Sequence, residues 1–185
     1  INIVSAYAPT ADKSKKDPKM REYFYTKLND LLRTHKSKHT TIVAGDFNAK
    51  TGSSRDDKVY HNTIGGYGKG QTNENGKHLL QFAKMNNLRL TNTFFNHKSS
   101  HRTTWESPAI PTNNWKNKYR NQIDYILVKE HKGIQYTDSR SYGGMQTPSD
   151  HKVVILTCYI KWPYTKPSKK KPTTINIANL RNDFM

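Results

Sequence analysis

An acid and an amide directly follow a short apolar run, and this junction constrains the fold more than any other part of the sequence. Residues 41–44 (TIVA) have the composition of a buried strand, and Gly45–Gly52 (GDFNAKTG) opens a loop after it. Side chains two residues apart on an extended segment point the same way. We therefore expect Asp46 and Asn48 to converge at the C-terminal end of the strand, with Phe47 turned back into the core.

A carboxylate beside an amide suits the activation of water next to a phosphate. The carboxylate of Asp46 accepts a proton, and the amide of Asn48 donates hydrogen bonds. Asp and Asn also favour turns after strands, so a simple turn is the competing interpretation. Three further polar features favour the chemical interpretation.

The first two features are an Asp-His pair and a lone acid in an apolar strand. Ser149-Asp150-His151 precedes the apolar run Val153–Leu156, so an acid and an imidazole lie at the entrance of a strand. Histidine is well suited to binding a phosphate oxygen or exchanging a proton near neutral pH. Asp124 lies inside an otherwise apolar strand, where a carboxylate is costly without a partner. We expect His151 to be that partner, which would fix the tautomer of the imidazole.

Each of these residues also has a plainer interpretation. His151 would then be an isolated surface histidine, and Asp124 an outward-facing acid on an edge strand. The third feature is Tyr7, a phenol at a strand end within SAYAP, which fits core packing equally well.

The chain carries a large excess of positive charge. Thirty-one Lys and Arg residues stand against fourteen Asp and Glu, which gives a formal net charge of +17. Such an excess raises the local concentration of polyanions and speeds their association. It predicts a nucleic-acid partner, DNA or alternatively RNA, with solubility as the competing explanation.

Expected strands outnumber expected helices. Strands are predicted at residues 2–8, 40–45, 88–92, 102–105, 122–128, 134–142 and 152–160, and helices at 17–35 and 75–85. The Gly-rich segment 64–70 lacks the context of a phosphate-binding loop and is interpreted as a flexible connection, and residues 108–119 as a polar insertion. The pattern suits two packed sheets with flanking helices, an α+β or α/β sandwich.

One domain is expected at residues 1–161, followed by a basic linker and the start of a further element at 162–185. The linker contains the Pro/Lys-rich stretch 166–172 (KPSKKKP). The chain begins without Met on an expected strand, which suggests a piece of a longer polypeptide. No stretch approaches the apolar length of a membrane span, so no membrane partner is expected. The single cysteine, Cys158, excludes a disulfide framework.

Five motifs in this order resemble the endonuclease/exonuclease/phosphatase superfamily, whose fold is DNase I-like: VSAYAPT, GDFNAKTG, TTW, NQIDYILV and SDH. The segments IGGYGKGQTNENGKHLLQFAKMNNLRLTNTFF and HRTTWESP are similar to one branch. That branch comprises the apurinic-type endonuclease domains of non-LTR (LINE) retrotransposons and their craniofacial development protein 2-like relatives. The resemblance covers about residues 1–161. It implies a four-layered sandwich, two β-sheets flanked by helices, and divalent-metal-dependent hydrolysis of phosphodiesters.

The resemblance also implies roles for the motif residues. Asp46 would orient or deprotonate the attacking water, and Asn48 would hold that water and a phosphate oxygen. His151 would donate to the phosphate as negative charge builds, and Asp124 would hold His151. Tyr7 would contact the phosphate or assist the leaving oxygen.

The resemblance places Asp150 as a support for the metal, expected to be Mg²⁺ (or Mn²⁺). In this superfamily the N-terminal portion supplies an Asn-bearing strand and then a Glu that is the principal metal ligand. This chain begins at the strand that ends in Tyr7, so both are missing. Because Mg²⁺ prefers near-octahedral oxygen coordination, Asp150 and Asp46 alone would hold it poorly. We expect the fragment of an ancestral nuclease to be weak or inactive.

Several basic and aromatic side chains are candidates for contacts with the DNA backbone or a groove. These are Arg102, Trp115, Lys116, Lys118, Arg120, Arg140 and Lys152. Trp105 is expected to be structural.

Three functions follow from these features. The first is an endonuclease that nicks DNA as in non-LTR retrotransposition, with Mg²⁺ positioning the phosphate. The second is a truncated or domesticated, catalytically weak nucleic-acid-binding module. The third is a phosphatase of the same superfamily that acts on inositol phosphates or lipids, against which the retrotransposon-like loops and the basic charge argue. An intracellular, nuclear location is expected.

Overall fold

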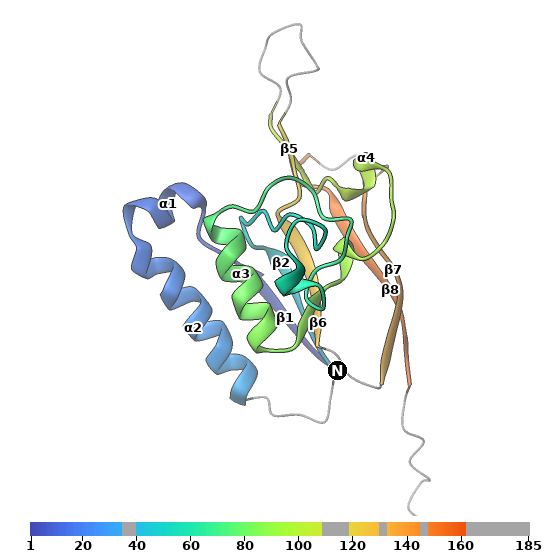
Figure 1. Ribbon diagram of the computed structural model, residues 1–185, viewed down its shortest axis with the longest axis horizontal. Helices are drawn as coiled ribbons and strands as arrows, with labels where there is room; N and C mark the ends of the chain where they lie inside the picture. Colours follow the sequence, from blue (N-terminus) through green and yellow to red (C-terminus); the bar gives the residue numbers. More distant parts are fainter. Residues whose placement is uncertain (35–39, 109–118, 130–132, 145–147, 162–185) are drawn as a thin grey trace, which may run out of the picture.

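A computed structural model describes residues 1–34, 40–108, 119–129, 133–144 and 148–161. Its centre is a four-stranded sheet (Figure 1) in the order β1 (Asn2–Tyr7), β2 (Thr41–Asp46), β6 (Asp124–Lys129) and β3 (Leu88–Leu90). β1 runs parallel to β2, whereas β6 is antiparallel to both β2 and β3. The end of β2 therefore lies beside the start of β6.

Two helices, α2 (Pro18–Thr34) and α3 (Glu74–Met85), cover one face of this sheet (Figure 1). Proline suits the first position of α2, and Asp17 before it accepts a hydrogen bond at 3.0 Å from a backbone N–H of the first turn. Asn73 caps α3 in the same way at 2.8 Å. The helices and the sheet enclose one apolar core, which includes Leu28, Val43, Phe47, Leu79 and Leu127.

A second, antiparallel pair of strands, β7 (Ile134–Tyr142) and β8 (Val153–Ile160), lies on the other side of the sheet from these helices (Figure 1). Thr91, the residue after β3, links this pair to the sheet, because its Oγ1 lies 2.8 Å from the carbonyl oxygen of Ile126 on β6 and 3.0 Å from Ser139 Oγ on β7. Helices packed with more than one sheet confirm the expected mixed α/β class. No helix in the described part of the chain is long and apolar enough to cross a membrane.

The remaining elements are short. They are α1 (Ala11–Lys16), η1 (Lys58–Tyr60), η2 (Thr91–Thr93), α4 (Ser99–Arg102), and the paired strands β4 (Trp105–Glu106) and β5 (Arg120–Asn121). Within the insertion expected at 108–119, residues 109–118 lie outside the described residues, as does the expected second unit at 162–185.

The strand expected at 102–105 was wrong. Helix α4 ends at Arg102, and a strand begins only at Trp105. Thr103 and Thr104 between them are fully buried and use their side chains for hydrogen bonds. β-branched residues favour strands in isolation, but here the hydroxyl groups decide the local structure. The helix expected at 17–35 is also preceded by a separate helix, α1, and the strand expected at 88–92 gives way to η2 at Thr91.

The Gly-rich segment 64–70 is packed against the fold rather than being a loose connection. Ile64 is fully buried, and the N–H of Gly65 donates to Thr93 Oγ1 at 2.8 Å. A Cβ atom at Gly68 would lie 1.8 Å from the carbonyl oxygen of Gly52, so glycine is needed for this close approach. The sequence missed this packing because the partners are distant along the chain.

Candidate active site

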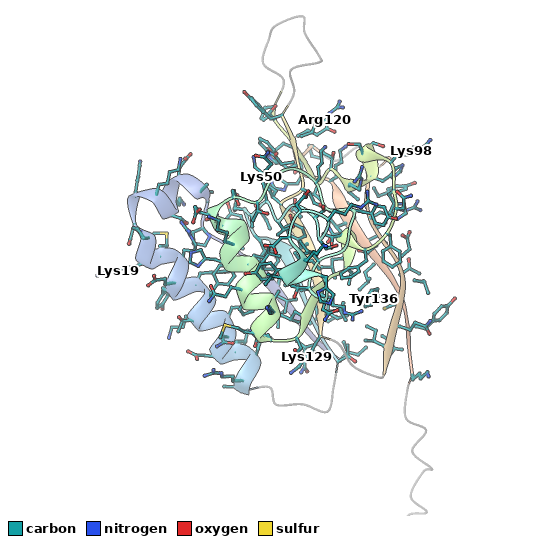
Figure 2. All side chains as sticks on the ribbon, in the orientation of Figure 1. Lys19, Lys50, Lys98, Arg120, Lys129 and Tyr136 are labelled. Atoms are coloured by element: carbon teal, nitrogen blue, oxygen red, sulfur yellow. The ribbon has the colours of Figure 1, made fainter. Side chains whose placement is uncertain are left out.

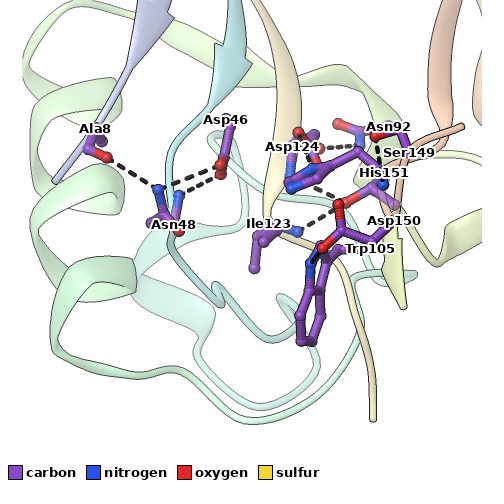
Figure 3. A network of polar contacts seen from close by, with 11 residues as sticks. Ala8, Asp46, Asn48, Asn92, Trp105, Ile123, Asp124, Ser149, Asp150 and His151 are labelled. Atoms are coloured by element: carbon purple, nitrogen blue, oxygen red, sulfur yellow. Dashed lines mark hydrogen bonds and ion pairs between the residues drawn. The ribbon is translucent and has the colours of Figure 1, made fainter. Parts of the chain in front are cut away.

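Asp46 and Asn48 meet at the end of β2, as the sequence predicts. The N–H of Asn48 donates to Asp46 Oδ1 at 2.8 Å, and Asn48 Nδ2 donates to Asp46 Oδ2 at 3.2 Å (Figure 3). Phe47 between them is fully buried. The cause differs from simple strand alternation, because Asn48 has a φ of +47°. Asparagine adopts this left-handed conformation more readily than most residues, and it turns the amide back onto the carboxylate.

Asn75 fixes the loop that carries Asn48. Its side chain is 3% exposed, and its Nδ2 donates to the carbonyl oxygens of Pro9 at 3.1 Å and Asn48 at 2.9 Å. Asn48 Nδ2 also donates to the carbonyl of Ala8 at 2.9 Å. The first turn of α3 therefore clamps the ends of β1 and β2 together. An Asn near a helix start is the only signal for this role in the sequence.

Asp124 and His151 are in contact, as expected. His151 Nδ1 lies 3.1 Å from Asp124 Oδ1 and 3.2 Å from Oδ2 (Figure 3). An ionised carboxylate only accepts hydrogen bonds, so Nδ1 carries the proton in this contact and Nε2 is left for proton exchange. In the β2–β6 register Asp124 pairs with Asp46. The acid–amide pair and the acid–imidazole pair therefore lie at neighbouring strand ends.

Thr104 links Asp124 to the segment that carries His151, a role that was not predicted from the sequence. Its Oγ1 accepts the N–H groups of Ile123 at 3.0 Å and Asp124 at 3.1 Å, and its carbonyl accepts the N–H of Lys152 at 2.7 Å. This buried threonine thus fixes the positions of the start of β6 and of Lys152, the residue after His151. Thr104 belongs to the TTW motif, but no contact was predicted for it from the sequence.

Asp150 is held by the neighbouring tryptophan. Trp105 Nε1 donates to Asp150 Oδ2 at 2.7 Å, and Trp105 pairs with His151 through an isolated β-bridge (Figure 3). This contact gives Trp105 the structural position that was expected. Asp150 itself is exposed.

The two partly buried carboxylates at the strand ends are electrostatically coupled. Burial raises the pKa of Asp46, while the N–H of Asn48 and the charge of His151 oppose the shift. Burial also raises the pKa of Asp124, against hydrogen bonding by Thr104 and the charge of His151, and the Asp46 charge adds to the rise. A cation between the carboxylates would relieve both penalties.

These residues fit a divalent cation. Asp46, Asp124 and His151 offer ligand atoms that all lie within 4.8 Å of one another. Two carboxylates supply the oxygen ligands that Mg²⁺ and Mn²⁺ prefer. Asp150, the ligand expected from the sequence, lies beside this group rather than in it, and its charge raises the pKa of Asp46.

Tyr7 lies at the end of β1, paired with Asp46 in the parallel register. Its side chain is 69% exposed, so the core-packing interpretation was wrong. The phenol is accessible beside the candidate site, and its contact with a phosphate stays a prediction.

Three of the expected nucleic-acid contacts gather near the TTW motif. Lys152 Nζ donates to Glu106 Oε1 at 2.5 Å, Arg120 Nε lies 3.6 Å from the same oxygen, and an Arg102 Nη atom donates to a backbone carbonyl at 3.2 Å. Arg140 instead pairs with Asp138 on β7 at 3.4 Å. The other candidates, Trp115, Lys116 and Lys118, lie outside the described residues.

Comparisons with known proteins show which family this chain resembles. Residues 1–155 match the family model described as endonuclease-reverse transcriptase. Craniofacial development protein 2 of Bos taurus is 30% identical over 161 residues, covering 87% of this chain and 25% of the relative. The protein of the same name from Tragulus javanicus is 29% identical, covering 87% of this chain and 26% of the relative. The chain thus spans about a quarter of the length of these curated relatives.

Among solved structures, the chain is similar to the 3′ phosphatase NExo from Neisseria, which was determined with a product DNA hairpin. The TM-score is 0.56 at 15% identity, over 86% of this chain and 61% of that one. At this identity the likeness concerns the fold, and it confirms the DNase I-like architecture. Since the family model spans most of the chain, the protein belongs to the endonuclease/exonuclease/phosphatase superfamily and, within it, to the endonuclease-reverse transcriptase family.

Proposed function

We propose that this chain is a metal-dependent phosphodiesterase that nicks DNA, as in non-LTR retrotransposition. The observation that carries the proposal is the meeting of Asp46–Asn48 and Asp124–His151 at adjacent strand ends. Asp46, held by the amide of Asn48, would supply a base, and His151, held by Asp124, would supply a proton donor at the same site. The net charge of +17 and the DNA hairpin bound to the NExo neighbour support DNA as the partner.

The roles follow from the contacts. Asp46 would accept the proton of the attacking water, and both hydrogens of Asn48 Nδ2 are directed to Asp46 and Ala8, so Asn48 would orient that carboxylate. His151 would donate to the phosphate oxygens as charge builds, with Asp124 fixing its tautomer. Mg²⁺ or Mn²⁺, when bound by the carboxylates of Asp46 and Asp124, would supply positive charge to the phosphate and the leaving oxygen. A ligand role for Asp150 stays a prediction.

Plasmid nicking tests the proposal. We expect conversion of supercoiled to open-circular DNA with Mg²⁺, no conversion with EDTA, and a loss of about 10²–10⁴-fold in rate for Asp46→Ala. Asp30→Ala, an exposed acid on α2, is the matched control and should nick as the unchanged protein does. Equal rates for Asp46→Ala and the unchanged protein, or nicking that persists in EDTA, would contradict the proposal.

The second function is a nucleic-acid-binding module with weak or no catalysis. It is favoured by the net charge of +17, which attracts a polyanion whether or not the site is catalytic. DNA binding without nicking in the presence of Mg²⁺ or Mn²⁺ would select this function. A nuclear location is part of either proposal.

The partner can be tested through salt. If phosphate contacts dominate binding, the logarithm of the DNA affinity should fall linearly with the logarithm of the salt concentration, by about 0.9 per contacted phosphate, for any duplex sequence. A titration by fluorescence anisotropy between low and physiological salt measures this slope. An affinity that does not depend on salt would rule out an interface led by phosphates.

A further inference from the structure

Four basic side chains gather beside the TTW motif at the edge of the candidate active site. We call them the basic cluster: Lys69, Arg102, Arg120 and Lys152. Lys152 directly follows His151, and both Lys152 and Arg120 approach the single carboxylate of Glu106. Figure 2 shows Arg120 on β5, away from the helical layer.

Lys69 is the one member of the basic cluster that was not among the nucleic-acid contacts expected from the sequence. It comes from the Gly-rich segment, where its N–H donates to Gln122 Oε1 at 3.0 Å. Its ammonium group donates to Thr103 Oγ1 at 2.5 Å, and Thr103 is fully buried. The next residue, Thr104, holds Asp124 and Lys152. Lys69 is therefore anchored at its backbone and at its tip to the segments that build the active site.

The charges around Lys69 are unbalanced. Burial lowers its pKa most, followed by the positive charges of Arg120 and Arg102, while Glu106 acts in the opposite sense and Lys152 adds to the lowering. Bringing like charges together in a partly desolvated place costs free energy unless an anion joins them. The basic cluster has four positive charges, against which Glu106 sets one carboxylate, so it suits a bound anion.

A cleft lies beside the basic cluster. Its volume is about 700 Å³, and its lining includes Ser149 and Asp150 together with Glu106 and Lys152. The first two belong to the SDH segment, and Lys152 belongs to the basic cluster. The two residues that flank His151 in the sequence, Asp150 and Lys152, both line this cleft, so it lies next to the candidate active site.

We propose that the basic cluster binds a second phosphate of the nucleic-acid strand, next to the scissile one, and that Lys69 is the residue which the Gly-rich segment supplies to it. The inference rests on the proposed function and deepens it, because it makes the substrate a polynucleotide. A small phosphate monoester would fill the catalytic position and leave the basic cluster without its anion.

DNA binding in EDTA tests Lys69 without requiring cleavage. Lys69→Gln removes the charge but keeps a side-chain donor for Thr103, so the loop contact can persist. We expect about tenfold weaker binding at low salt and a salt slope smaller by about 1, whichever duplex is used. Lys69→Arg should keep the slope. Lys19→Gln, which removes an equal charge from the exposed face of α2, is the matched control and should not change the slope.

Neutral phosphate analogues then locate the contact. Methylphosphonates are placed one at a time on either side of the mapped nick, and one position should weaken binding of the unchanged protein but not weaken Lys69→Gln further. A Lys69→Gln protein that unfolds at the normal temperature yet binds with the unchanged slope would overturn the inference. The inference would also be overturned if every methylphosphonate position weakened DNA binding by Lys69→Gln further. Absence of Mg²⁺-dependent nicking by the unchanged protein would instead refute the proposed function, while the binding slopes would still decide the role of Lys69.

Discussion

His151→Ala is expected to lower the rate of DNA nicking by about 10²–10⁴-fold, the range typical for loss of a positioned proton donor. The reason is that His151 is the imidazole at the site, held at 3.1 Å by Asp124. Asp124→Asn should also depress the rate, because an amide in that place can donate to Nδ1 and select the wrong tautomer. The side chain of His151 is partly exposed, so its removal should leave the fold intact.

The double variant distinguishes a coupled pair from two independent residues. If Asp124 acts through His151, the combined Asp124→Asn and His151→Ala variant should lose little more than the worse single variant. Single-turnover nicking rates measure the cycle, and thermal unfolding of each variant controls for stability. His61→Ala, which removes an exposed histidine directly after η1, is the matched control substitution. Fully additive losses would show that the two residues act separately.

Local patterns were sufficient for the elements on which the site is built. The strand expected at 134–142 has the observed bounds of β7, and the ends of β1 and β2 lie within one residue of those expected. The pairing of Asp124 with His151 was also predictable, because a carboxylate inside an apolar strand needs a partner. These features depend on alternation and on the cost of burying charge, which a sequence displays directly.

Features that depend on distant partners could not be predicted. Thr104 organises the site through hydrogen bonds to residues about twenty positions away, and a buried threonine has no local signature of this role. Lys69 belongs to a segment whose packing is set by Thr93 and Gln122. The left-handed conformation of Asn48 was not predicted for another reason. Alternation along a strand already placed its side chain beside Asp46, so nothing in the sequence called for a turn.

The second large effect concerns Gly45, which directly precedes Asp46. In the parallel pairing of β1 with β2, a Cβ atom at Gly45 would lie 1.8 Å from the carbonyl oxygen of Ala6. The three nearest atoms are all backbone atoms of Ala6, so no flexible side chain can yield, and Gly45→Ala must displace one strand from the other. We expect the free energy of unfolding to fall by about 4 kcal/mol or more, at the exceptional end for single substitutions.

Thermal or urea unfolding, followed by circular dichroism, measures this loss. For a chain of this length each kcal/mol corresponds to about 2–4 °C in Tm, so the transition should move by about 8–16 °C or disappear. Gly143→Ala is the matched control, because its new Cβ would meet only side-chain atoms of Lys152, the nearest at 3.8 Å. Its effect should stay within about 0.5 kcal/mol. An unchanged midpoint for Gly45→Ala would mean that β1 does not approach β2 in this register, and Asp46 would then lose the support that places it beside Asp124.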